Sequence, residues 1–279
     1  MHRFPLAACC LSLVITPSVQ ALQDGTADDA WKDIILKGTY ADVDQKDHAR
    51  AEKVFLQGLH EAERFGPNDI RVGATLNKLG LVYHEEKKLA EADSAFRRSL
   101  PIFQTVYGDE SIDVANVNYD IGSVLIDEGK HADALVFLER SRSTYEKLFG
   151  ANSVKIADVL CMLGDSHRTL REWSDAEGPL KQCAKIREMN DGILSPGVGE
   201  AVNSLAEVYR KEGKYGLADP EYKLAEKIRE HSLGIMNPAF ADTLEAHASM
   251  LKEMGRDKDA EKDATLAAAI RRNQKKNKQ

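Results

Sequence analysis

The fold of this chain is decided by residues 76–96, which read LNKLGLVYHEEKKLAEADSAF. Its apolar residues fall into two runs with helical spacing, namely Leu76, Leu79 and Tyr83, and then Ala92 and Phe96. Apolar residues three or four positions apart line one side of an α-helix. The stretch therefore predicts two amphipathic helices that are joined by a short polar turn and pack against each other.

The same pattern recurs with a period of 42 residues from residue 66 onward. Residues 42 positions apart are called a column below. One column consists of glycine alone: Gly66, Gly108, Gly150, Gly192 and Gly234. Another consists of alanine alone: Ala92, Ala134, Ala176, Ala218 and Ala260. A fixed period of this length is typical of repeat architectures, so we predict an all-α fold, an α-α superhelix of antiparallel helix pairs.

A third column contains only small residues: Gly80, Gly122, Gly164, Ala206 and Ala248. We expect Gly80 to face Phe96 where the two helices cross, because large side chains on both sides would wedge the pair apart. The glycine that follows each second helix is expected to supply the left-handed residue of a helix C-terminal cap.

These columns resemble the tetratricopeptide repeat, whose pattern W-x2-L-G-x2-Y followed by A-x3-F is matched with Leu76 in place of the tryptophan. The period exceeds the usual 34 residues by about two helical turns, as in the long repeats of kinesin light chains. The resemblance covers residues 66–272. It implies a solenoid that binds a peptide or protein partner in its concave groove, with no cofactor and no small-molecule substrate.

Residues 1–21 have the three parts of a secretory signal: a positive end at Arg3, an uncharged apolar run, and small residues around a cut after Ala21. We therefore expect export to the periplasm or the extracellular space. The residues from Leu6 to Cys9 also resemble the lipobox of bacterial lipoproteins, which leaves a lipid-anchored subunit of an envelope complex as an alternative.

The predicted organisation of the chain follows from these boundaries. It comprises a signal peptide (1–21), a linker (22–28), a degenerate amino-terminal capping repeat (29–65), five tetratricopeptide units (66–272) and a basic disordered tail (273–279). Terminal repeats are expected to deviate because they cap the solenoid and expose one face to water. A membrane contact through the basic tail is possible in principle but disfavoured.

First-helix residues that turn away from the partner helix are expected to face the concave groove. They are Asn77, His84, Asn116, Tyr119, Asp158, Asp165, Arg168, Glu200, Asn203, Glu207 and Arg210. Asparagine suits a groove for an extended peptide because its amide both donates and accepts hydrogen bonds. The lysine and asparagine cluster that clamps a terminal carboxylate in chaperone-binding members is absent from its usual columns. For each residue alone, a plain solvated surface position stays open as the alternative.

Catalytic signals in the sequence are weak. His167 follows Ser166, but it shares a column with Tyr83 and Tyr209, so we expect a core histidine. The sequence has no H-E-x-x-H motif, no Walker motif and no C-x-x-C pair, and we predict no catalytic residue, metal site or cofactor. A net charge of -7 argues against nucleic-acid binding. The predicted function is a non-catalytic interaction scaffold; an accessory partner of an enzyme on a separate chain is a further alternative.

Two cysteines follow the expected signal peptide, and they fall at the same level of one predicted helix pair. Cys161 lies opposite Cys183 as Gly164 lies opposite Leu180 in an antiparallel hairpin. An exported protein meets conditions in which such a pair can form a disulfide. Alternatively, Cys161 points into the groove and Cys183 replaces a small buried alanine, and the sequence leaves both possibilities open.

Overall fold

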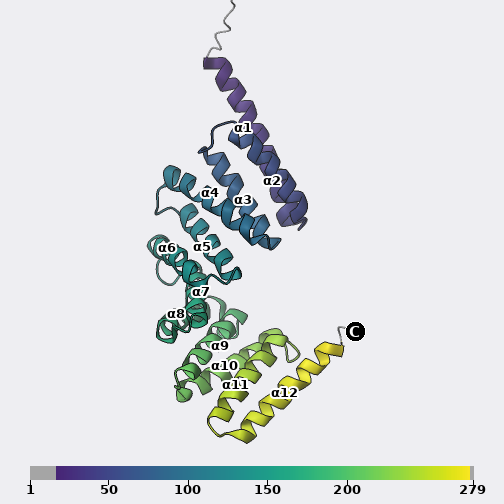
Figure 1. Cartoon of the computed structure of the whole chain (residues 1–279), viewed down its shortest axis with the longest axis vertical. Coiled ribbons are helices and arrows are strands. Elements are labelled where there is room, and N and C mark those ends of the chain that lie inside the picture. Colours follow the sequence, from purple (N-terminus) through teal and green to yellow (C-terminus); the bar gives the residue numbers. More distant parts are fainter. Residues whose placement is uncertain (1–16, 277–279) are drawn as a thin grey trace, which may run out of the picture.

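The computed structural model describes residues 17–276, and all elements in this range are helical. Figure 1 shows the helices stacked along one long axis from α1 to α12. In chain order they are α1 (Pro17–Thr39), a π-helical turn (Tyr40–Asp44), α2 (His48–Glu63), α3 (Ile70–Glu85), α4 (Leu89–Tyr107), α5 (Ile112–Asp127), α6 (His131–Phe149), α7 (Val154–Thr169), α8 (Trp173–Asp191), α9 (Pro196–Lys211), α10 (Tyr215–Leu233), α11 (Pro238–Glu253) and α12 (Asp257–Lys276).

Consecutive helices form antiparallel pairs, beginning with α1 and α2 and continuing through α3 and α4 to α11 and α12. Contacts also join each odd-numbered helix from α3 onward to the next odd-numbered helix. The odd-numbered helices therefore lie side by side and form one face of the stack, which we call the inner face. The predicted α-α superhelix is confirmed.

The small-residue columns lie where the two helices of a pair cross. A Cβ atom added to Gly80 would lie 2.6 Å from the Phe96 ring, and one added to Gly122 would lie 2.7 Å from Leu138. The expected contact between Gly80 and Phe96 is thus confirmed. The alanine column is fully buried in all five units, in residues Ala92, Ala134, Ala176, Ala218 and Ala260.

The glycines that end the second helices differ in detail from the expected left-handed cap. At Gly108 the backbone has φ 81° and ψ 161°, and Gly150, Gly192 and Gly234 adopt nearly the same values. The φ angle is positive as expected, but the ψ angle is extended and not helical. Only glycine adopts this combination readily, which explains why the column admits no other residue.

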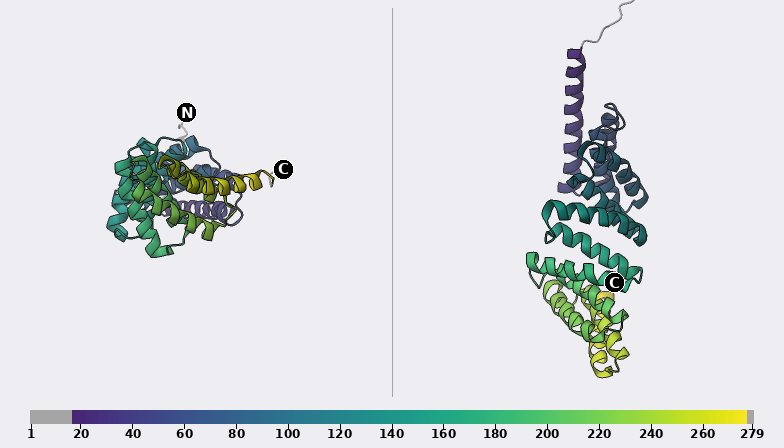
Figure 2. Two further views of the ribbon diagram at one scale, coloured as in Figure 1. Left: turned by 90° about the horizontal axis from the view of Figure 1, so that it is seen from below. Right: turned by 90° about the vertical axis from the view of Figure 1, so that its left-hand side faces the viewer.

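Both ends of the described chain are more helical than the sequence predicted. The helix α1 begins at Pro17 and continues through the expected linker 22–28, and α12 extends to Lys276, which makes residues 273–276 of the expected disordered tail helical. In the right-hand view of Figure 2 the earliest part of α1, in purple, stands clear of the other helices. The repeat columns gave no signal there, because they begin after these residues at one end and stop before them at the other.

Other parts of these predictions fall on residues outside the described range. Residues 1–16, with the lipobox cysteine Cys9, and residues 277–279 belong to this group. Within residues 17–276, no helix is both long enough and apolar enough to cross a membrane. The segment expected to form a capping repeat contains the end of α1, the π-helical turn and α2, and Gly38 there abuts Phe55 as Gly80 abuts Phe96.

A disulfide joins Cys161 of α7 to Cys183 of α8, with 5.5 Å between the two Cα atoms. Of the two possibilities that the sequence left open, the structure has the bridge. It links the two helices of the third unit, near the middle of the solenoid.

Candidate functional site

The residues expected to face the groove divide into two groups along the inner face. One group lies over α3, α5 and the beginning of α7. The other lies over the end of α7 and over α9. The two groups differ in whether their polar side chains are bound to each other.

A cavity of about 290 Å³ lies on the inner face between α3, α5, α6 and α7. We call it the amino-terminal pocket, and it brings together four of the predicted residues, which come from three different helices. Its lining consists of Asn77, Leu81, Asn116, Tyr119, Asp120, Tyr145, Lys155 and Asp158.

The two amides of the amino-terminal pocket have different partners. The Tyr145 hydroxyl donates to Asn116 Oδ1 at 2.6 Å and so holds that amide in place. In contrast, Asn77 Oδ1 is buried and has no hydrogen-bond partner among residues 17–276. Burying an acceptor without a partner costs free energy, so a ligand that donates a hydrogen bond here would recover it.

The carboxyl group of Asp120 is the unusual acid of the pocket. Burial raises its pKa to about 7, and only the positive charge of Lys155 opposes this effect. The Lys155 ammonium lies 5.6 Å from the centre of the Tyr145 ring. Near neutral pH the Asp120 carboxyl is therefore partly protonated and is able to donate a hydrogen bond as well as accept one.

The carboxy-terminal half of the inner face carries two arginines whose side chains are already bound. Arg168 Nη1 donates to Glu207 Oε2 at 2.6 Å, which connects α7 to α9, and Arg168 Nε donates to Asp165 Oδ1 at 3.0 Å. Arg210 Nη2 donates to Ser249 Oγ at 2.7 Å and to Glu253 Oε1 at 2.5 Å, which connects α9 to α11. We call Asp165, Arg168, Glu207, Arg210, Ser249 and Glu253 the arginine ladder.

The remaining predicted residues lie outside the amino-terminal pocket. His84 Nε2 lies 3.1 Å from Asp127 Oδ2, so this side chain contacts the next repeat. Glu200 is exposed on α9. Asn203 is partly buried on the same helix, and its Oδ1 has no hydrogen-bond partner in the described part of the chain. The structure therefore does not gather all predicted groove residues into one site.

Three polar lining residues of the pocket were not predicted from the sequence: Asp120, Tyr145 and Lys155. The sequence could have indicated Tyr145, because the same column contains Arg187, Arg229 and Arg271 in the later units. These second-helix side chains reach first-helix residues, as Tyr145 reaches Asn116 and as Arg187 Nη2 reaches Asp158 Oδ1 at 3.0 Å. Asp120 and Lys155 had no such signal, since single charged residues on amphipathic helices are usually solvated.

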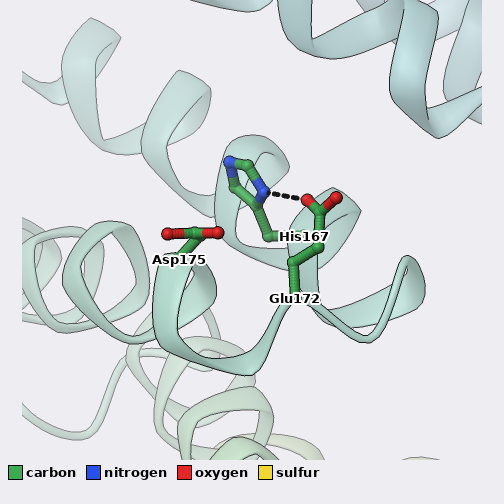
Figure 3. Close-up of side chains that lie close together, drawn as sticks. All are labelled: His167, Glu172 and Asp175. Carbon is green, nitrogen blue, oxygen red and sulfur yellow. Dashed lines mark hydrogen bonds and ion pairs between the residues drawn. The ribbon is translucent and has the colours of Figure 1, made fainter.

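The expected core histidine, His167, is not in the core. Figure 3 shows its ring beside Glu172 and Asp175, at the turn from α7 to α8. His167 Nδ1 lies 2.7 Å from Glu172 Oε2, and the imidazole side chain is 20% exposed. The adjacent Ser166 is buried, and its hydroxyl lies 3.5 Å from Nδ1 of a different histidine, His131. A serine nucleophile activated by His167 is therefore not assembled here.

Part of the sequence matches profiles of a known repeat family. Sequence profiles described as the tetratricopeptide repeat match residues 72–113 and 113–189. Among proteins of curated function, none matches this sequence significantly.

Several solved structures have a similar fold. BtubC (BKLC) from P. vanneervenii is 22% identical, with a TM-score of 0.67 over 82% of this chain and 92% of that chain. A repeat protein of the kinesin light chain type from Podosopora anserina is 15% identical, with a TM-score of 0.61 over 72% of this chain and 95% of that chain. YrrB, described as having an unusual peptide-binding site, is 15% identical, with a TM-score of 0.54 over 76% of this chain and 91% of that chain.

Proposed function

Because this chain belongs to the tetratricopeptide repeat superfamily, with long repeats of the kinesin-light-chain type, we propose that it is an exported, non-catalytic scaffold that binds an extended segment of a protein partner. The partner segment lies along the inner face, and its main contact is the amino-terminal pocket. Proteins of similar fold that bind peptides, such as YrrB, support a role in protein interaction.

The observation that carries this assignment is a cavity on the inner face whose lining includes a buried amide oxygen without a partner and a carboxyl with a raised pKa. The arginine ladder satisfies its own charges within the chain. The amino-terminal pocket leaves Asn77 Oδ1 without a partner and holds an Asp120 carboxyl whose charged form no hydrogen bond stabilises. Polar groups that lack internal partners are the ones that a ligand can satisfy at little cost.

The lining of the pocket fits a peptide backbone better than a small charged molecule. The amides of Asn77 and Asn116 offer donors and acceptors, which match the N–H and C=O groups of an extended chain. Leu81 and Tyr119 add apolar surface, and the cavity of about 290 Å³ has room for a side chain of the bound segment. The partner is therefore expected to present an extended segment with an uncharged side chain at this position.

Two further parts of the proposal have separate support. Export is favoured by the apolar run that precedes Ala21, and a disulfide between Cys161 and Cys183 is compatible with an oxidising compartment. The non-catalytic part is favoured by the absence of a recognisable catalytic motif in the sequence and by the separation of Ser166 from His167 in the structure.

The proposal can be tested by selecting peptides from a phage-displayed library on the purified chain and by mapping the bound peptide with hydrogen–deuterium exchange. We expect added protection in α3, α5 and the first turns of α7. A selection that yields no specific peptide, or protection confined to α9 and α11, would contradict the proposed site.

A further inference from the structure

A buried histidine in the last helix pair occupies a position that the repeat normally reserves for an aliphatic side chain. His247 of α11 shares its column with Leu79, Ile121, Leu163 and Leu205, all of which are buried. Its own side chain is only 3% exposed. A polar ring in this place costs free energy unless its two nitrogens have partners, and the neighbouring helices supply them.

Three carboxylates converge on the two ring nitrogens of His247. On one side, Nδ1 lies 2.7 Å from Glu226 Oε1 of α10 and 3.3 Å from Asp263 Oδ2 of α12. On the other side, Nε2 lies 3.1 Å from Asp219 Oδ1 of α10. The Tyr222 ring stacks on the imidazole with 5.3 Å between ring centres. A single N–H at Nδ1 therefore faces two carboxylates.

The carboxylate at Nε2 has other cationic partners, whereas the two carboxylates at Nδ1 have none in the described part of the chain. Asp219 is also paired with Lys223 and with Arg256, whose Nη1 lies 3.0 Å from it. Among residues 17–276, Glu226 and Asp263 have no ion-pair partner other than His247. One protonated imidazole cannot neutralise two partly buried carboxylates, so a negative charge is left over at Nδ1.

We propose that Nδ1 of His247 and the carboxylates of Glu226 and Asp263 bind a divalent transition-metal ion of the Zn²⁺ type. The three donor atoms already lie within 4.8 Å of one another. Imidazole nitrogen and carboxylate oxygen are common Zn²⁺ ligands, and a tetrahedral ion with bonds of about 2.0–2.2 Å holds its ligands roughly 3.3 Å apart. The distance from His247 Nδ1 to Asp263 Oδ2 already has this value. Glu226 Oε1 must move away from Nδ1 by a few tenths of an ångström to reach it.

Asp219 has a defined part in this site. When the ion binds, Nδ1 gives up its proton to solvent, and the remaining N–H at Nε2 donates to Asp219. Such a carboxylate behind a metal-bound histidine fixes the ring orientation and strengthens the ligand. The two carboxylates at Nδ1 then neutralise the ion, and a water molecule completes its coordination. The ion ties α10, α11 and α12 together.

This metal site was not expected from the sequence, because the three ligands are far apart in the chain and form no linear motif. A second histidine and carboxylate cluster, His167 with Glu172 and Asp175 (Figure 3), lies closer together in the sequence. Its two carboxylates are exposed, so water screens their charge and the cluster has little need of an ion. It serves as the matched control.

The test is zinc titration of the full chain after removal of bound metal with a chelator. We expect one Zn²⁺ per chain by calorimetry, about one proton released per ion, and a higher midpoint of thermal unfolding. Asp263→Asn and Glu226→Gln should each weaken binding at least tenfold, and Asp219→Asn should weaken it by about 10–100-fold. Glu172→Gln should leave binding unchanged.

Two further measurements keep the test decisive if a variant folds poorly. His247→Leu restores the aliphatic residue of the column, so this variant should keep its helical circular dichroism and yet lose the ion. X-ray absorption at the zinc edge should show nitrogen and oxygen ligands without sulfur. No zinc binding to the parent chain, sulfur in the coordination shell, or loss of binding in Glu172→Gln alone would overturn the proposal.

Discussion

The two halves of the inner face are built from the same columns but differ in what their polar groups bind. In the amino-terminal half, the pair of Asn116 and Tyr145 is uncharged and borders a cavity. In the next repeat the same two columns hold Asp158 and Arg187, which form an ion pair. Further along, the arginine ladder connects α7, α9 and α11. The repeat thus fixes where side chains point, and the residue chosen at each position decides between internal contact and binding.

This difference suggests that one half of the inner face stabilises the solenoid and the other half binds the partner. The arginine ladder joins successive first helices and should stabilise the solenoid. In the amino-terminal pocket, Asn116 and Asp158 have internal partners. Within the described part of the chain, Asn77 Oδ1 and the Asp120 carboxyl have no hydrogen-bond partner, so these two groups contribute little to stability and are available to a ligand. Substitutions in the arginine ladder should therefore lower the free energy of unfolding. Substitutions in the amino-terminal pocket should instead weaken the binding of a ligand.

The largest expected effect concerns the disulfide at the junction of the halves. Cys161 and Cys183 are 22 positions apart, and the chain-entropy model gives about 3 kcal/mol for a loop of this size. Reduction of the bond should lower the free energy of unfolding by about that amount, measured by urea denaturation with and without a phosphine reductant. A change below about 0.5 kcal/mol would show that the bridge does not constrain the unfolded chain.

The next prediction compares two residues of one column, one from each half of the inner face. Arg210 and His84 occupy the same column, but the Arg210 side chain is only 14% exposed and contacts Ser249 and Glu253. Arg210→Ala should lower the free energy of unfolding by about 2–3 kcal/mol, because it leaves charged hydrogen bonds unmade. His84→Ala should cost about 0.5 kcal/mol, because His84 contacts the single carboxylate of Asp127 at the surface. Equal losses would remove the distinction between the halves.

A smaller effect is expected from the acid in the amino-terminal pocket. The pKa of Asp120 is raised to about 7 in the folded chain, so the unfolded state loses this proton first as the pH rises. Stability should therefore fall between about pH 4 and pH 7 and then level off. Asp120→Asn should flatten this fall and raise the free energy of unfolding at pH 8 by about 2 kcal/mol, allowing for partial exposure.

The measurement is urea denaturation at a series of pH values, with Asp165→Asn as control. Asp165 is bound to Arg168 in the arginine ladder, so its substitution should destabilise the chain. An unchanged pH dependence in Asp120→Asn would mean that this carboxyl is solvated in the folded state.

The fold could be predicted from the sequence because its period is fixed and its small residues are placed by packing. Gly80 against Phe96 is an example, since only one arrangement of the pair accommodates both. The helical content of the ends could not be predicted, because α1 and α12 begin or end beyond the columns.

The candidate site was only partly predictable. The columns placed Asn77 and Asn116 on the inner face, but they do not show which side chains contact these amides. Arg168 was expected in the groove, yet it is bound to Glu207 of the following repeat. The burial that raises the pKa of Asp120 arises in a pocket that is lined by α3, α5, α6 and α7. Residues from four helices meet there, and they form no linear motif.

The central claim is that the amino-terminal half of the inner face is the binding half, and one pair of matched variants tests it most directly. Asn77 and Asn203 share a column, three repeats apart, and both have an Oδ1 atom without a partner. The measurement is the affinity of a selected peptide for Asn77→Ala and for Asn203→Ala, with far-UV circular dichroism to confirm folding. We expect Asn77→Ala to weaken binding about tenfold, which corresponds to about 1.4 kcal/mol, and Asn203→Ala to change it less than about twofold. An equal loss in both variants, or a loss only in Asn203→Ala, would contradict the account.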